Sequence, residues 1–218
     1  MRRRYDEELE NLHNLLVEMG NLCQEAIFMA AHIIQEDNPV KEAVEAKEKE
    51  IDKKEREIEQ LCMHLILRQQ PIASDLRRIG AALKMITDME RIGDQAADIA
   101  DLSRFIAGKK TQGKSQEHLW RMAQATVKMV TDSVTSFVND DYNMALQVMK
   151  ADDEVDTLFE KIKKDIMEMI RSQAVDAEGP LDLLMAAKYF ERIGDHAVNI
   201  AEWVEFSITG IHKGEALQ

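Results

Sequence analysis

Apolar residues recur along most of this chain at alternating spacings of three and four, the pattern of helices that each bury one face. The pattern is interrupted at Asn38-Pro39, at Pro71, in the stretch 108–114, between Asn139 and Tyr142 and at Gly179-Pro180. Proline and glycine commonly separate helices, so these interruptions mark helix ends. The sequence predicts six long helices, at about residues 6–35, 39–67, 71–107, 115–139, 142–171 and 180–210.

The second half of the chain repeats the first. The five residues from Glu90 to Asp94 recur letter for letter from Glu191 to Asp195. The second helices of the two halves align with a shift of 104 residues, and the third helices with a shift of 101. The chain is therefore predicted to be an all-α tandem repeat of two three-helix bundles. The predicted repeats cover residues 1–108 and 115–218, joined by a linker at 109–114.

Each half carries two pairs of acidic residues four positions apart, one pair on its second helix and one on its third. Residues four apart lie on one face of a helix. The first acid of each pair falls where the spacing calls for an apolar residue, so two packed helices can direct four carboxylates into one volume. The eight acids are Glu48, Asp52, Glu90, Asp94, Asp152, Asp156, Glu191 and Asp195.

A carboxylate inside a helical core is costly unless it is protonated or paired with a cation. A site made only of carboxylate oxygens suits hard or borderline metal ions. We therefore predict a metal site in each half, with iron, manganese, magnesium or zinc as the candidate ions. The alternative is that these acids lie on solvated helix faces, as most charges in acidic helical proteins do. Four matched pairs favour metal binding over that alternative.

The residues around these pairs receive other roles. Glu55 also falls on the apolar seam, but its counterpart is Phe159, so we expect an edge position or an isolated ion pair. Arg91 and Arg192 could pair with these acids or face solvent, and we expect solvent. A glycine in mid-helix costs about 1 kcal/mol relative to alanine, so the glycine of each repeated motif predicts close helix packing beside the acids.

The net charge of −13 argues against binding nucleic acid or an anionic membrane surface and favours cations or basic partner surfaces. Cys23 and Cys62 fall in apolar helical positions and are predicted to be reduced core residues. The basic start of the chain is followed by acids, unlike a signal peptide. Apolar stretches are far shorter than the ~20 residues of a spanning helix. We expect a soluble, cytoplasmic protein without direct membrane insertion.

Two motifs suggest other functions. Residues 108–115 match the phosphate loop GxxxxGK[ST], but that loop must follow a strand, and no strand is predicted in this chain. A ferritin-like metal enzyme needs two ExxH units, and the chain offers one, Glu10 with His13. No histidine recurs between the halves, and no catalytic nucleophile is marked. We expect no enzyme activity, with a metal-dependent enzyme of ferritin-like type as the alternative.

The tandem bundles and their paired acids resemble the PhoU family, the accessory and regulatory proteins of bacterial phosphate-specific transport. This resemblance implies metal at the paired motifs and a homodimer. It also implies negative control of phosphate uptake and of phosphate-starvation signalling, by contact with the transporter's ATPase subunit and a phosphate-sensing membrane histidine kinase. The motifs that carry it are Glu48-xxx-Asp52, Glu90-Arg-Ile-Gly-Asp94, Asp152-xxx-Asp156 and Glu191-Arg-Ile-Gly-Asp195.

Overall fold

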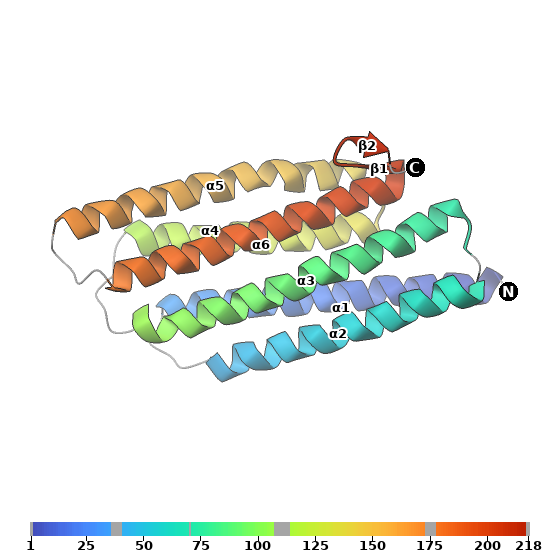
Figure 1. The fold of residues 1–218 in the computed structure, drawn as a ribbon, viewed down its shortest axis with the longest axis horizontal. Coiled ribbons are helices and arrows are strands. Elements are labelled where there is room, and N and C mark those ends of the chain that lie inside the picture. Colours follow the sequence, from blue (N-terminus) through green and yellow to red (C-terminus); the bar gives the residue numbers. More distant parts are fainter. Residues whose placement is uncertain (1, 36–40, 70, 107–113, 173–177, 217–218) are drawn as a thin grey trace.

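The computed structural model describes residues 2–35, 41–69, 71–106, 114–172 and 178–216. Nearly all of these residues are helical, and all six predicted helices are present (Figure 1). Their observed ends lie within a few residues of the predicted ones. The helices are α1 Arg2–Gln35, α2 Lys41–Gln69, α3 Ala73–Ile106, α4 Lys114–Val138, α5 Tyr142–Arg171 and α6 Glu178–Thr209.

The turn between α4 and α5 shows how local sequence ends one helix and begins the next. Asp140 adopts a left-handed backbone conformation with φ 52°, which turns the chain out of α4. The backbone N–H of Asp141 donates to the carbonyl oxygen of Ser136 at 2.8 Å. The side chain of Asp141 then accepts a hydrogen bond from the backbone N–H of Met144, which caps the start of α5.

The six helices form two three-helix bundles that lie side by side. Helices α1 to α3 make the lower bundle in Figure 1, and α4 to α6 make the upper one. Helices α3 and α6 run in opposite directions and pack against each other at the junction, where α1 also contacts α4. The predicted all-α tandem repeat is confirmed. Of the predicted linker, all but Lys114 lies outside the described residues, and Lys114 opens α4.

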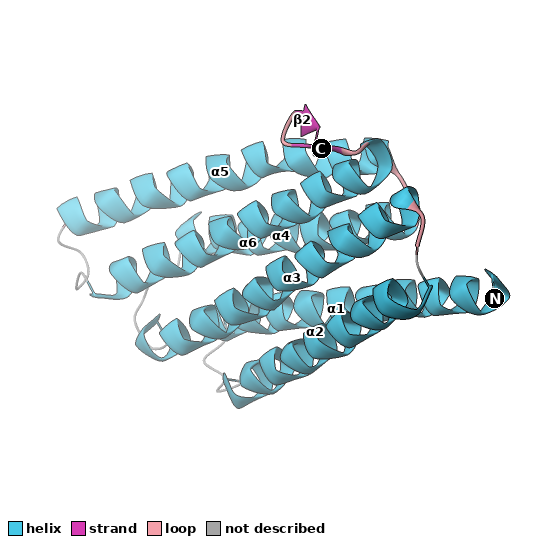
Figure 2. Cartoon of the chain, turned by 45° about the vertical axis from the view of Figure 1, so that its right-hand side comes forward, coloured by secondary structure: helices cyan, strands magenta, loops and turns pink. Residues whose placement is uncertain are grey.

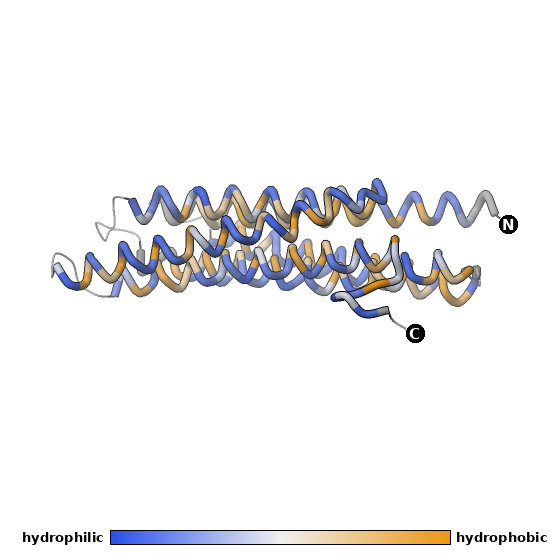
Figure 3. Tube along the Cα trace, turned by 90° about the horizontal axis from the view of Figure 1, so that it is seen from above, coloured by the Kyte–Doolittle hydropathy of each residue, from blue (hydrophilic) through white to orange (hydrophobic). Residues whose placement is uncertain are grey.

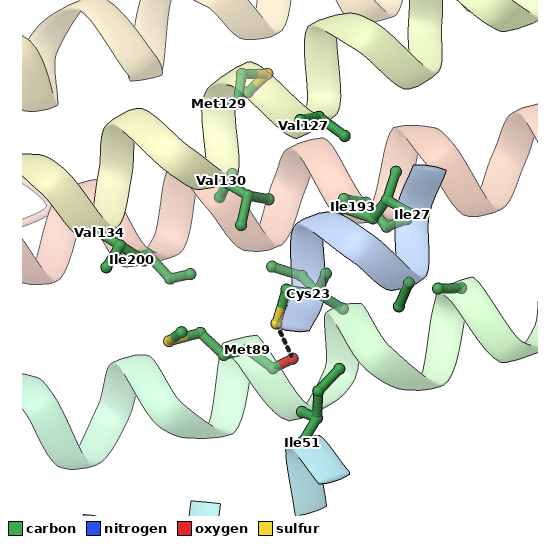
Figure 4. Close-up of a cluster of buried hydrophobic side chains, with 14 of the residues drawn as sticks. Cys23, Ile27, Ile51, Met89, Val127, Met129, Val130, Val134, Ile193 and Ile200 are labelled. Atoms are coloured by element: carbon green, nitrogen blue, oxygen red, sulfur yellow. Dashed lines mark hydrogen bonds between the residues drawn. The ribbon is translucent and has the colours of Figure 1, made fainter. Parts of the chain in front are cut away.

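One hydrophobic core runs through both bundles. Cys23 of α1, Val130 of α4 and Ile193 of α6 all contribute to it (Figure 4). A Cβ atom placed on Gly20 of α1 would come within 3.3 Å of a methyl group of Val134 in α4. The two repeats therefore bury apolar surface against each other as well as within each bundle.

Both cysteines lie in this core, as their apolar positions predict. Each is a free thiol, and burial raises the pKa of Cys23 and of Cys62 to about 12. The thiol of Cys23 donates a hydrogen bond to the carbonyl oxygen of Met89, with a sulfur–oxygen distance of 3.4 Å (Figure 4). Burial therefore disfavours the thiolate form of both cysteines near neutral pH, as expected for core residues.

Polar and apolar residues alternate around each helix, so that one face of each helix is apolar (Figure 3). This arrangement is the one that the spacing of apolar residues predicts. Among the described residues, no helix combines the length and the apolar character that crossing a bilayer requires.

A short hairpin follows α6, where the sequence predicts only a polar tail and no strand (Figure 2). Strands β1 Ile211–His212 and β2 Glu215–Ala216 pair antiparallel. The two residues between them, Lys213 and Gly214, have φ of 51° and 80°, as a two-residue hairpin turn requires. The His212 ring stacks on Trp203 of α6 with ring centroids 3.8 Å apart, and this contact holds the hairpin against the helix.

Candidate metal centre

The eight predicted acids lie on two pairs of neighbouring helices, α2 with α3 and α5 with α6. The glycine of each repeated motif lies where the two helices of a pair approach each other. A Cβ atom on Gly93 would be 3.0 Å from Cδ1 of Ile51, and one on Gly194 would be 3.1 Å from Oδ1 of Asp152. These distances confirm the predicted close packing beside the acids.

The first acid of each pair is half-buried, which agrees with its place on the apolar seam. The side chains of Glu90 and Glu191 are 20% and 17% exposed. The second acids differ between the halves: those of the first half are half-buried, whereas Asp156 and Asp195 are exposed. The first half therefore encloses its acids more completely than the second.

In the first half, acids on α2 and α3 influence each other. Burial raises the pKa of Glu48, and the negative charges of Asp52 and Asp94 raise it further. Burial also raises the pKa of Glu90, with contributions from the charges of Asp94 and Asp52. An acid shifts the pKa of another when the two lie close together. Helices α2 and α3 therefore bring all four predicted acids of this half into one region.

Glu55 lies beside the same region, and its partial burial agrees with the expected edge position. It is half-buried, and burial followed by the charge of Asp52 raises its pKa. The charge of Glu55 in turn contributes to the raised pKa of Glu90 on α3. The sequence indicated this location, because Glu55 falls on the apolar seam and lies three residues after Asp52. Comparison with Phe159 left Glu55 out of the predicted ligands, because the second half has no acid at this position.

In the second half, Asp152 has the most strongly raised pKa. Burial raises its pKa from 3.8 to about 6, and the charges of Asp156 and of Asp195 on α6 contribute. Its Oδ1 atom is buried and finds no hydrogen-bond donor among the described residues. A buried carboxylate oxygen without a donor is costly, and a cation would remove that cost.

Each half holds a basic side chain against its motif acids. In the first half, Nη1 of Arg91 lies 2.9 Å from Oδ2 of Asp94, and its Nε lies 3.4 Å from Oε2 of Glu90. In the second half, Nζ of Lys188 contacts the carboxylate of Glu191. Arg91 is exposed as predicted, but it is paired with the acids and is not simply solvated. These basic side chains neutralise part of the negative charge that a metal ion would otherwise neutralise.

The donor chemistry fits a hard cation. Every predicted ligand is a carboxylate, and Asp152 presents a buried oxygen that lacks a partner. In the part of the chain that the structure describes, however, no three His, Cys, Asp or Glu side chains are arranged to hold a metal ion. The helices thus bring the four acids of the first half into one region, and Asp152, Asp156 and Asp195 of the second half into another. The carboxylates of these regions do not converge on a shared point.

A polar bridge between the halves was not predicted from the sequence. Nδ1 of His196 on α6 lies 2.8 Å from Oδ1 of Asp88 on α3, and Nδ2 of Asn199 donates to the same oxygen at 3.2 Å. Nearby, burial and other acids raise the pKa of Asp98 on α3, and the positive charge of the exposed Arg192 on α6 opposes that rise. These contacts connect the helices that carry the two repeated motifs.

The competing motifs lie elsewhere. Glu10 is exposed on α1, and the half-buried His13 packs edge-on against the ring of Phe137, with centroids 6.1 Å apart. Burial, followed by the charge of Arg78, lowers the pKa of His13. Residues 108–113 of the phosphate-loop match lie outside the described residues, and residues 114 and 115 are helical. The Glu10–His13 motif therefore does not join the paired acids.

The fold and these acidic regions define a class of tandem three-helix-bundle proteins whose halves repeat one carboxylate arrangement. The PhoU domain matches this chain twice, over residues 16–103 and 119–204. The chain belongs to the PhoU family.

Relatives extend over nearly the full length. A "phosphate-specific transport system accessory protein PhoU homolog" of Clostridium acetobutylicum is 33% identical, covering 96% of each chain. The crystal structure of PhoU from Pseudomonas aeruginosa is similar with a TM-score of 0.87 and 30% identity, covering 95% of this chain and all of that one. The phosphate transport system regulatory protein PhoU from Streptococcus pneumoniae has a TM-score of 0.86 and 25% identity, covering 98% and 99%.

Proposed function

We propose that this protein regulates phosphate homeostasis by restraining the phosphate-specific ABC transporter and phosphate-starvation signalling. The observation that carries the proposal is the match of the PhoU domain to both halves. Relatives that cover nearly the whole chain are named as accessory proteins of phosphate-specific transport. A match of both halves supports a shared role more strongly than a single shared motif, because fold alone does not imply function.

The regulation acts through protein contacts. The partners are the ATPase subunit of the transporter and a phosphate-sensing membrane histidine kinase, and the protein works in the cytoplasm as a homodimer. Six long helices offer extended rigid faces for such contacts. The net charge of −13 supports partners with basic surfaces and disfavours nucleic acid.

Both halves bind divalent cations at the paired motifs. Glu48, Asp52, Glu90 and Asp94 hold the cation in the first half. In the second half the ligands are Asp152, Asp156, Glu191 and Asp195. A cation held by these residues would supply positive charge that keeps the carboxylates ionised. The unpartnered oxygen of Asp152 and the raised pKa values of Asp152, Glu48 and Glu90 support this assignment.

The protein has no catalytic turnover in this proposal. A metal-dependent enzyme of ferritin-like type is the alternative, and purified manganese- or iron-loaded protein distinguishes the two in oxidase and phosphatase assays. Turnover above that of free metal would favour the enzyme.

The decisive experiment is a clean deletion of the gene in its host, with measurement of phosphate uptake and of phosphate-starvation transcripts at high phosphate. We expect both to be derepressed and to return to normal on complementation. Pulldown with the transporter ATPase and with the kinase then tests each contact separately. Normal repression in the deletion strain would contradict the regulatory role.

A further inference from the structure

Large apolar side chains that are exposed to solvent lie mainly at two places on this molecule. Ten such side chains occur among the described residues, and eight of them lie where α2 ends and α3 begins or where α5 ends and α6 begins. The eight are Met63, Leu67, Ile72, Leu76, Met167, Ile170, Leu181 and Met185. Single exposed apolar residues are ordinary, whereas clusters of them commonly mark protein contacts.

The two places are equivalent in the repeat and lie at opposite ends of the molecule (Figure 1). The second helices align with a shift of 104 residues, so we name residues 56–68 the α2 end and residues 160–172 the α5 end. Met63 of the α2 end corresponds to Met167 of the α5 end, and the two residues are 47% and 41% exposed. Methionine is flexible and adapts to an apolar partner surface. Both halves thus present the same adaptable apolar side chain.

The α2 end also has a groove around its methionine. The groove is lined by Glu59, Gln60, Met63, His64, Leu67 and Arg68. Leu67 is 75% exposed, more than any other large apolar residue of the described chain. Covering such a side chain removes apolar area from water, which favours the association that covers it.

The charges around the two methionines are opposite at three equivalent positions. The equivalent residues are Arg56 with Glu160, Glu57 with Lys161, and Glu59 with Lys163. The two ends therefore share their apolar centre and differ in the charges that surround it. Opposite charges on two surfaces select the pairing between them and suppress the pairing of like surfaces.

Some of these charges already have partners within their own chain. The internal ion pairs are Arg56 with Asp52, Glu57 with Lys54, and Lys163 with Glu160. The charges without an oppositely charged partner among the described residues are Glu59 and Arg68 at the α2 end, and Lys161, Lys164, Glu168 and Arg171 at the α5 end. Each unpaired charge of the α2 end thus has an unpaired opposite charge at the α5 end.

We propose that the α2 end of one copy of this protein docks on the α5 end of a second copy, with Met63 and Met167 at the centre of the contact. The two ends of one molecule lie at its opposite ends and cannot meet, so the complementary surface comes from another copy (Figure 1). This inference rests on the proposed homodimer and names the surface that forms it. Because the two docking surfaces differ, the contact either closes into a dimer or ring or continues as an open chain.

The apolar side chains supply most of the affinity, and the charges select the partner surface. A contact between two helix ends is small, so we expect a dissociation constant of about 1–100 µM. A solvated ion pair at the rim contributes little by itself. Reversing one of its charges replaces attraction by repulsion, which should weaken association about tenfold.

Sedimentation velocity of the purified full chain at about 1–200 µM measures self-association. E59K and K164E should each weaken it about tenfold, and M63S and M167S should weaken it without changing the charge. E59K and K164E proteins mixed in equal amounts should associate again. In the mixture, the reversed α2 end of one variant meets the reversed α5 end of the other, so opposite charges face each other at every contact.

E50K and K150E are the matched controls. Glu50 and Lys150 are exposed on α2 and α5 but lie outside the two ends. These substitutions change the net charge by the same amount as E59K and K164E, so they should leave self-association nearly unchanged. Circular dichroism verifies that every variant is folded.

The outcomes separate this inference from the proposed function. Self-association that E59K and K164E leave unchanged, or that E50K and K150E weaken equally, would overturn the proposed surface and leave the homodimer intact. A mixture of E59K and K164E that stays dissociated would overturn the pairing of the α2 end with the α5 end. A wild-type chain that is monomeric at about 200 µM would overturn the surface and the homodimer together, while the gene deletion still tests the regulatory role.

Discussion

Replacing Asp152 with asparagine tests whether the motif acids are under electrostatic stress when no metal is bound. Burial, together with the charges of Asp156 and Asp195, raises the pKa of Asp152 from 3.8 to about 6. The folded chain then binds a proton more readily than the unfolded chain. The contribution of Asp152 to the stability of the metal-free protein should therefore be least unfavourable at or below about pH 4, become more unfavourable as pH rises to about 6, and stay so above that.

The magnitude follows from the size of the pKa shift. A rise of about two pH units corresponds to about 3 kcal/mol, and solvent screening of the half-buried Asp152 reduces this to about 1–2 kcal/mol. In a chain of this length, 1 kcal/mol changes the melting temperature by about 2–4 °C. At pH 7 in chelator, D152N should melt about 2–8 °C above the wild type. The difference should shrink as the pH is lowered to 4.

The assay is thermal unfolding followed by circular dichroism between pH 4 and pH 8, with chelator and with saturating Mn²⁺. Metal should reverse the order, because a cation bound only by the folded wild type stabilises it and the amide ligand binds the cation less well. E168Q is the control, since Glu168 is exposed on the same helix and is not among the charges that raise the pKa of Asp152. Such substitutions usually change stability by less than about 0.5 kcal/mol. Equal melting of wild type and D152N at pH 7 in chelator would refute the reasoning.

Three further outcomes are expected. A Cβ atom added at Gly80 meets nothing within 4 Å, whereas one added at Gly194 lies 3.1 Å from a carboxylate oxygen. In urea unfolding, G80A should therefore stabilise the folded protein by up to about 1 kcal/mol, whereas G194A should not. Replacing Glu90 and Asp94 together with alanine should remove about half of the bound metal in elemental analysis, and unchanged stoichiometry would argue against the first-half site. F137A should cost about 3–5 kcal/mol in the same urea assay, because Phe137 is fully buried, and a loss below 1 kcal/mol would contradict its place in the core.

The helices were predictable because each buries one apolar stripe, and the spacing of that stripe is visible in the sequence. The start of α1 was missed by four residues, because Arg2 to Arg4 carry no apolar residue that extends the stripe. The hairpin after α6 was missed for a different reason. Its turn lacks the usual Asn-Gly signal, and the stacking of His212 on Trp203 is a tertiary contact that local sequence does not reveal.

The acids of the candidate site were found by comparing equivalent positions of the two halves. The same comparison led us to overlook residues that occur in only one half. Glu55 was set aside because its counterpart is Phe159. The bridge between Asp88 and His196 was hidden for a geometric reason. Helices α3 and α6 pack in opposite directions, so residues that meet across the junction are not equivalent in the repeat. Their contact can be found only once the packing is known.

The differences between the halves lie where they disturb the fold least. Both repeats keep apolar residues at Ile51 and Val155, which are fully buried at the packed helix pairs. The charged and aromatic differences fall on Glu55, Phe159 and Lys188, which are all only half-buried. A substitution at the margin of a core costs much less stability than one inside it. A duplicated bundle can therefore retain one architecture while its two acidic regions acquire different charges.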